Sequence, residues 1–225
     1  AFIVLVLLIA RKNGLKALFA LIVTIAFIIK IFIPAIYSGY SPILFAIITA
    51  IFSSLVTIYF TVGMNKKFVV ALLGVTSGVL IAGILSYIFT YTMRLNGFLD
   101  SDLLSCAYLL KKIKIKELIP AGVIIGSLGA VMDVAVSITS SINELHEANP
   151  NISKKSMFKS AINIGNDIIG TMINTLILAY IASSIFTLLL IYIQANEYPL
   201  IRILNFQDIV VEIMRSICGS IGILI

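Results

Sequence analysis

Long apolar segments alternate with short polar connectors along most of this 225-residue chain. A helix needs about 20 apolar residues to cross the ~30 Å hydrocarbon core of a bilayer. Spanning backbone must satisfy its own hydrogen bonds, and continuous apolar runs indicate helices rather than barrel strands. The pattern predicts spans at residues 15–33, 43–62, 68–90, 118–142 and 166–193, with partial spans at 1–10 and from about 213.

The predicted fold is a single all-α domain over residues 1–225, a polytopic transmembrane helical bundle of about six to seven spans. Both terminal spans look truncated because the chain begins and ends inside apolar runs, so we expect it to be a fragment of a longer protein. Composition agrees, since only 12% of residues are charged and the mean hydropathy is +1.14. Soluble domains carry about 25% charged residues.

Basic residues in short connectors indicate which ends of the spans face the cytoplasm. By this rule, connectors 11–16 and 63–67 and the hairpin 143–160 are cytoplasmic. The connector 34–42 is uncharged and rich in Pro, Gly and Tyr, so we expect it outside. Alternation then places 91–117 outside, as an amphipathic or re-entrant connector.

The 91–117 connector also holds the main evidence against this orientation. It carries four lysines, at positions 111, 112, 114 and 116, on the side where the rule expects few. A re-entrant helix over residues 99–110 would reverse the side of the membrane that alternation assigns to this segment, and so resolve the conflict.

Two predicted spans carry polar residues at identical spacing, with offsets 0, 4, 7 and 11. The first stripe is Asp133, Ser137, Ser140 and Glu144, and the second stripe is Asn163, Asp167, Gly170 and Asn174. At about 100° per residue, each stripe occupies a strip roughly 60° wide on one helix face. An ionisable residue inside a spanning helix costs about 2.5–3.5 kcal/mol even on the lenient insertion scale, so it usually faces partners or water.

The short hairpin between these two helices predicts that they are antiparallel neighbours. Facing stripes would enclose Asp133 and Asp167 among hydroxyls and amides, with Asn166 and Thr171 beside them. Such oxygen ligands suit Na⁺, H⁺, Mg²⁺ or Ca²⁺, or one acid stays protonated and hydrogen-bonds the other. The structural alternative is that Asp133 and Asn174 only join helices through hydrogen bonds.

The depth of Asp167 depends on where its helix begins. From Ala161 to Ile193 the helix would be ~50 Å long, too long for an upright span. Either Gly165 and Gly170 break it, or residues 153–165 lie in the membrane interface after a Ser153 cap.

Glycine pairs spaced by four residues predict close helix packing. The predicted packing glycines are Gly122, Gly126, Gly129, Gly74, Gly78 and Gly170. A third stripe repeats the offsets 0, 4, 7 and 11, with Asp208, Glu212, Arg215 and Gly219. We interpret it as an interfacial amphipathic helix leading into the last span, with Glu212 and Arg215 as a local pair.

No motif in the sequence indicates an enzyme or a cofactor. Walker, HExxH, GxSxG and CxxC patterns are absent, and the two acids lack the Tyr-Asp and Gly-x-Gly-Asp context of intramembrane aspartyl proteases. Cys106 and Cys218 are too few for a disulfide framework or a metal site. We therefore expect no enzyme activity, no cofactor and no nucleic-acid partner.

The two polar spans also resemble a known family. GSLGAVMDVAVSITSS (126–141) and NIGNDIIGTMINTLILAY (163–180) are similar to segments of the YibE/F family of bacterial membrane proteins. The likeness extends to RKNGLKA (11–17), NKK (65–67) and RSICGSIG (215–222), and so covers nearly the whole chain. It implies a multipass protein of the bacterial cytoplasmic membrane, without an established activity. Position 166 is commonly basic in similar proteins, whereas this chain has Asn166.

Two functions follow from these observations. The first is transport of a cation, or of a solute coupled to a cation or proton, through a site between the helices that carry Asp133 and Asp167. The second is a non-transporting membrane subunit that assembles with itself or with a related membrane protein, its stripes serving as contacts. Against transport, no inverted repeat relates the two halves of the chain.

Overall fold

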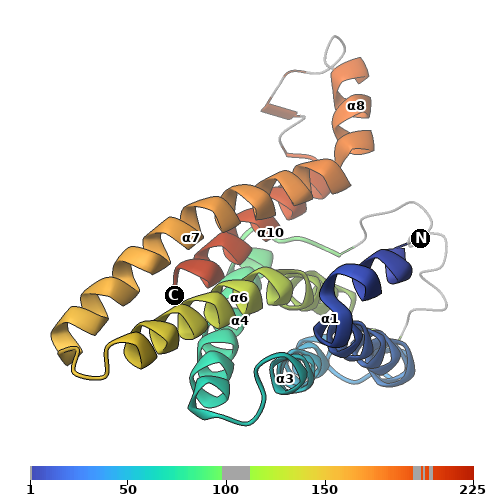
Figure 1. Ribbon diagram of the computed structural model, residues 1–225. Coiled ribbons are helices and arrows are strands. Elements are labelled where there is room, and N and C mark those ends of the chain that lie inside the picture. Colours follow the sequence, from blue (N-terminus) through green and yellow to red (C-terminus); the bar gives the residue numbers. More distant parts are fainter. Residues whose placement is uncertain (1, 98–111, 195–198, 200, 203–204) are drawn as a thin grey trace.

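A computed structural model describes residues 2–97, 112–194, 199, 201–202 and 205–225. The elements in these residues are all helical, which confirms the predicted all-α fold (Figure 1). In chain order they are α1 (Phe2–Phe27), the π-helical turn η1 (Ile28–Phe32), α2 (Ile33–Tyr37), α3 (Pro42–Val62), α4 (Lys66–Thr92), α6 (Ile115–Ala148), α7 (Lys154–Ser183), α8 (Ile185–Gln194) and α10 (Gln207–Leu224).

Five helical segments in the described part are long and apolar enough to cross a membrane, fewer than the six to seven predicted. They are Gly14–Tyr37, Pro42–Val62, Lys67–Thr92, Ile115–Ala148 and Lys154–Ser183. The separate span expected at 1–10 and the connector expected at 11–16 are wrong, because α1 continues through both. The basic segment contains no proline, and Gly14 alone does not end a helix.

The first span ends later than expected, at Tyr37. Pro34 has no N–H to donate to the preceding turn. The chain accommodates it with the π-helical turn η1 and continues as α2. The Ser41 hydroxyl then caps α3 by accepting a hydrogen bond from the Leu44 N–H, with Pro42 in the first helical position.

The hairpin expected at 143–160 is shorter in the structure, because α6 continues to Ala148 and α7 begins at Lys154. The Ser153 hydroxyl caps α7 by accepting a hydrogen bond from the Ser156 N–H at 3.2 Å, as predicted. The helix then runs unbroken through both of its glycines. It ends at Ser183 rather than continuing to 193, and α8 projects away from the bundle (Figure 1).

Helices α3, α4 and α6 form the centre of the bundle. Gly74 lies against Ala135, and Gly83 lies against Ile124, so α4 and α6 are antiparallel. Helices α6 and α7 are antiparallel as well, since Gly165 lies against Ile138 and Gly126 lies against Tyr180. The predicted antiparallel pair is therefore present (Figure 1).

The third stripe belongs to α10, which packs inside the bundle against α4, α6 and α7. Met214, Cys218 and Ile223 of this helix are buried. The expected interfacial helix followed by a separate span is thus wrong, because one helix carries both the charges and the apolar residues. Ile213 and Ile217 of the same helix are each about half exposed.

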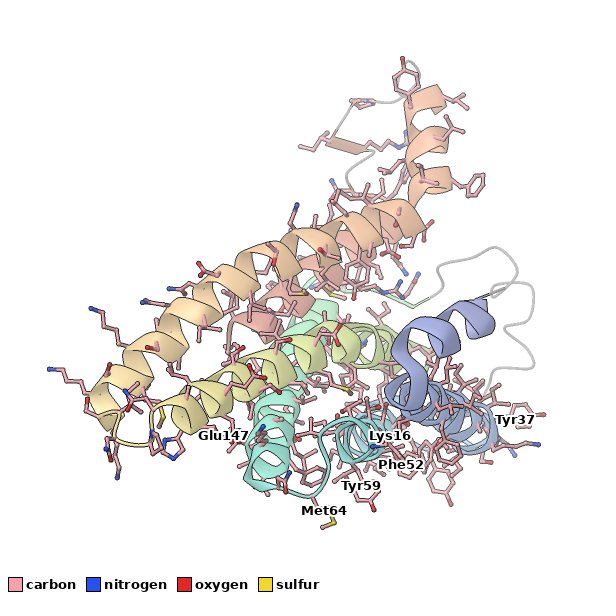
Figure 2. All side chains as sticks on the ribbon, in the orientation of Figure 1. Lys16, Tyr37, Phe52, Tyr59, Met64 and Glu147 are labelled. Carbon is pink, nitrogen blue, oxygen red and sulfur yellow. The ribbon has the colours of Figure 1, made fainter. Side chains whose placement is uncertain are left out.

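The connectors gather at two ends of the molecule. The Ser41 hydroxyl donates a hydrogen bond to Glu117, and Gly39 lies beside the Lys112 carbonyl, so segments 38–41 and 112–117 share one end. Because the helices alternate in direction, the 63–65 and 149–153 connectors share the other. In Figure 2, Met64 and Glu147 lie toward this second end and Tyr37 toward the first. The re-entrant helix expected at 99–110 lies outside the described residues.

Candidate functional site

The first stripe lies on an open face of α6. Asp133, Ser137 and Glu144 are exposed, and Ser140 is partly buried. On the opposite side of the helix, Ile124, Leu128 and Val131 are buried against the bundle. The structure therefore places these polar side chains along one accessible strip, as the spacing predicts.

The second stripe lies on the outer face of α7. Helix α7 contacts the bundle through Gly165, Ile169, Met172 and Leu176. At about 100° per residue, the centre of the stripe is roughly 150° around the helix from that contact face. All members of the stripe, Asn163, Asp167, Gly170 and Asn174, are exposed, and so are Asn166 and Thr171.

The two stripes therefore do not face each other within one chain. Asp133 and Asp167 form no hydrogen bond or ion pair with any residue that the structure describes. In the same part of the chain, no group of three His, Cys, Asp or Glu residues is placed to hold a metal ion. Each carboxylate remains available to a ligand or partner that approaches from outside the chain.

Hydroxyl groups near the second stripe are mostly bonded within α7. Thr171 donates a hydrogen bond to the Ile168 carbonyl at 2.8 Å, and Thr175 donates to the Thr171 carbonyl at 2.9 Å. Such back-bonding leaves the hydroxyl lone pairs free to accept. The face of α7 that points away from the bundle is thus rich in acceptors.

Four of the six predicted packing glycines lie at contacts within the chain. A Cβ added at Gly78 would be 2.5 Å from the Gly222 carbonyl oxygen, at the crossing of α4 and α10. Gly74 lies against Ala135, while Gly122 and Gly126 make room for Arg215 and the Tyr180 hydroxyl. An added Cβ at the other two, Gly129 and Gly170, meets nothing within 4 Å.

A second polar cluster lies where α6, α7 and α10 meet, and the sequence interpretation missed its setting. Arg215 Nη1 donates to Glu212 Oε1 at 2.7 Å, and each side chain is only 26% exposed. Glu212 Oε2, Arg215 Nε and the Tyr180 hydroxyl are buried without a hydrogen-bond partner among the described residues. The available signal was the third stripe itself, whose spacing matches the other two.

A cavity of about 240 Å³ adjoins this cluster, between α7, α8 and α10. Its walls are mainly apolar, with Ile177, Ile181, Ile213 and Ile217 among them. Tyr180 and Glu212 of the polar cluster also line it. The exposed stripes on α6 and α7 carry the two carboxylates that are unpaired among the described residues, and they remain the candidate site.

The fold and the polar stripes together define a multipass helical membrane protein with ionisable residues on its spanning helices. The profile of the YibE/F-like protein family matches residues 1–225. The chain belongs to this family, as the resemblance of its two polar segments indicated. Searches of curated proteins and of solved structures found no match.

Proposed function

We propose that this protein transports a cation, or a solute coupled to a cation or proton, across the bacterial cytoplasmic membrane. The observation that carries the proposal is the pair of carboxylates, Asp133 and Asp167, on the exposed polar stripes of two neighbouring spanning helices. Neither has a partner among the described residues. The proposal assigns no catalytic residue and no cofactor.

The cost of placing acids in hydrocarbon supports this function. Each acid costs about 2.5–3.5 kcal/mol at the centre of a spanning helix, unless water, a cation or a partner group stabilises it. Serine hydroxyls beside Asp133 and asparagine amides beside Asp167 supply further hard oxygen ligands, of the kind that Na⁺, Mg²⁺ and Ca²⁺ prefer. The first stripe extends from Asp133 to Glu144, one turn before α6 ends at Ala148, as a hydrated path to one surface would require.

A second candidate function is a non-transporting subunit that assembles with itself or with a related membrane protein. The outward direction of the second stripe favours it, because amides on the outer face of a spanning helix commonly hydrogen-bond another helix. In that case Asp133→Asn would leave the assembly intact.

Thermal unfolding of the purified protein in detergent, across monovalent and divalent cations and pH values, tests the transport proposal. A ligand that binds only the folded form at 100 times its Kd adds about 2.7 kcal/mol of stability. We expect one cation to stabilise the wild type and Glu147→Gln, which alters an exposed acid of α6 outside both stripes, but not Asp133→Asn. Flux of that cation into liposomes should then be lost in Asp133→Asn and kept in Glu147→Gln.

The transport proposal fails if no cation or proton changes the unfolding temperature and Asp133→Asn is simply less stable than the wild type. The carboxylate would then be a structural contact, and the subunit function would be favoured.

A further inference from the structure

The cavity between α7, α8 and α10 is large enough to hold a small organic molecule. Its volume is about 240 Å³, and an apolar cavity of about 150 Å³ already holds benzene. It is open on one side, because Ile177, Ile213 and Ile217 in its wall remain between 36% and 48% exposed. A ligand with an apolar body can therefore enter it from outside the bundle.

The cavity lies close to one end of the spanning helices. Its α7 residues run from Ile177 to Ser184, the last two turns of a helix about 45 Å long. The first turns of α10 lie beside them, because the two helices are antiparallel (Figure 1). The hydrocarbon core is only about 30 Å thick, so this end of α7 reaches the membrane interface. A ligand here can keep its apolar body in hydrocarbon and a polar head near water.

Among the described residues that line the cavity, both charged side chains are acids. Asp208 is exposed in the first turn of α10, and Glu212 lies one turn farther along the helix. Arg215, which pairs with Glu212, is directed toward α6 instead, since its Nη2 lies 3.5 Å from a Cβ added at Gly122. The charge that faces the cavity is therefore negative.

The ion pair with Arg215 leaves part of the Glu212 carboxylate available. A carboxylate accepts about four hydrogen bonds, and Arg215 uses Oε1. The other oxygen, Oε2, has no hydrogen-bond partner among the described residues. The Tyr180 hydroxyl is directed elsewhere, 3.0 Å from a Cβ added at Gly126 of α6. Because the last torsion of a Glu side chain is soft, Oε2 can turn toward a donor that a ligand brings into the cavity.

We propose that this cavity binds a lipophilic amine, with its apolar body against Ile177, Ile181 and Ile217 and its ammonium group at Asp208 and Glu212. An ammonium group carries three donors and the charge opposite to that of both acids. The two acids repel an anionic ligand, and opposite charges attract more strongly beside apolar walls than in bulk water. The site goes beyond the proposed cation transport, because it shares no residue with the first and second stripes.

Thermal unfolding of the purified protein in detergent tests the site with three probes that have the same apolar body. Phenylbutylamine, phenylbutanol and phenylbutyrate carry a positive, a neutral and a negative head at neutral pH. A ligand that binds only the folded form raises the unfolding temperature. We expect the amine to reach half of its full effect at a several-fold lower concentration than the alcohol, and the carboxylate to act most weakly. Equal effects of amine and alcohol would overturn the ammonium site and leave a cavity for hydrocarbon chains.

Two adjacent serines provide matched variants that show whether the amine binds in the cavity. Ser183 and Ser184 donate a hydrogen bond to the Tyr180 carbonyl, at 2.8 and 3.0 Å respectively. Of the two, Ser184 lines the cavity. Ser184→Leu should therefore fill the cavity and reduce the effect of the amine several-fold, whereas Ser183→Leu should not. Equal effects in the two variants would place the amine in the micelle or elsewhere on the protein, and would overturn the proposal.

Asp208→Asn tests the acid at the opening of the cavity. It should remove most of the difference between amine and alcohol, while Glu147→Gln, at an exposed acid of α6, should keep that difference. The unfolding temperature without a probe shows that each variant is folded. An unchanged preference for the amine in Asp208→Asn would contradict recognition of the ammonium group by this acid.

Asp133→Asn separates this site from the transport proposal, and it should leave the effect of the amine unchanged. Amine binding in a protein that no cation stabilises would refute the cation site and keep the cavity site. Stabilisation by a cation that depends on Asp133, without any preference for the amine, would refute the cavity site and keep the cation site.

Discussion

Glu212 and Arg215 lie one turn apart on α10, and each partly neutralises the other in an apolar setting. Their bond of 2.7 Å uses one carboxylate oxygen and one guanidinium nitrogen. The remaining buried atoms, Glu212 Oε2 and Arg215 Nε, have no partner among the described residues. Removing one member therefore leaves a poorly solvated charge, while removing both leaves only neutral groups.

We expect Arg215→Met to lower the free energy of unfolding by roughly 2 kcal/mol. Removing one member of a fully buried ion pair costs about 3–5 kcal/mol, and the loss is smaller here because about a quarter of each side chain is exposed. The double variant with Glu212→Gln should regain part of this loss. A double-mutant cycle of unfolding in detergent measures the coupling. Lys30→Met, at an exposed lysine of the π-helical turn, is the control. Additive losses would show that the pair does not stabilise the fold.

At the scale of helices, the hydrophobic pattern predicts that spans exist better than it predicts where they end. The spans at 43–62 and 68–90 match α3 and α4 within about two residues, a usual margin for helix ends. The pattern failed where charge and helix continue together, as at Arg11 in α1 and Glu144 in α6. Helical backbone does not require apolar residues, so the loss of hydropathy at these points did not mark a helix end.

The crossing of α4 and α10 depends on two glycines that touch. A Cβ at Gly78 would meet the Gly222 backbone at 2.5 Å, which no rotamer change relieves. Gly78→Ala should therefore separate the helices and cost about 1–3 kcal/mol, as overpacking does. Thermal unfolding checks this, with Gly129→Ala as the control, since that position is open and alanine favours helix by up to about 1 kcal/mol. Equal stability of the two variants would mean that the helices do not cross closely at Gly78.

At the scale of the whole molecule, the candidate site was predictable in composition but not in orientation. The spacing of Asp133, Ser137 and Ser140 was enough to place them on one face of α6. Which face of α7 meets the bundle depends on how Gly165, Met172 and Leu176 fit between α6 and α10, and no single-helix pattern contains that information. The stripes were expected to face each other, whereas the second stripe points outward.

The arrangement of connectors bears on the lysines of the 91–117 segment. Lys114 pairs with Glu117 at 3.7 Å, and Glu117 accepts a hydrogen bond from Ser41. This segment and the uncharged 38–41 connector therefore lie at one end, so the lysine-rich segment does not reverse the alternation of spans. The charge rule weighs long connectors less than short ones, which explains why Lys112, Lys114 and Lys116 can lie there.

Labelling of single cysteines with a membrane-impermeant maleimide checks this topology. The labelling is done in intact cells that express a variant of the protein in which both native cysteines are replaced. Ser38→Cys and Lys114→Cys should react from the same side. Met64→Cys and Asn151→Cys lie at exposed positions of the two connectors at the opposite end. These variants should react only after the membrane is permeabilised, because basic residues next to both connectors favour the cytoplasm. The basic residues are Lys66, Lys67, Lys154 and Lys155. If Lys114→Cys reacted together with Met64→Cys instead, an odd number of crossings would separate residues 38 and 114. The polar stripe of α6 would then start from the opposite membrane face, and any path along Asp133 would open to the other compartment.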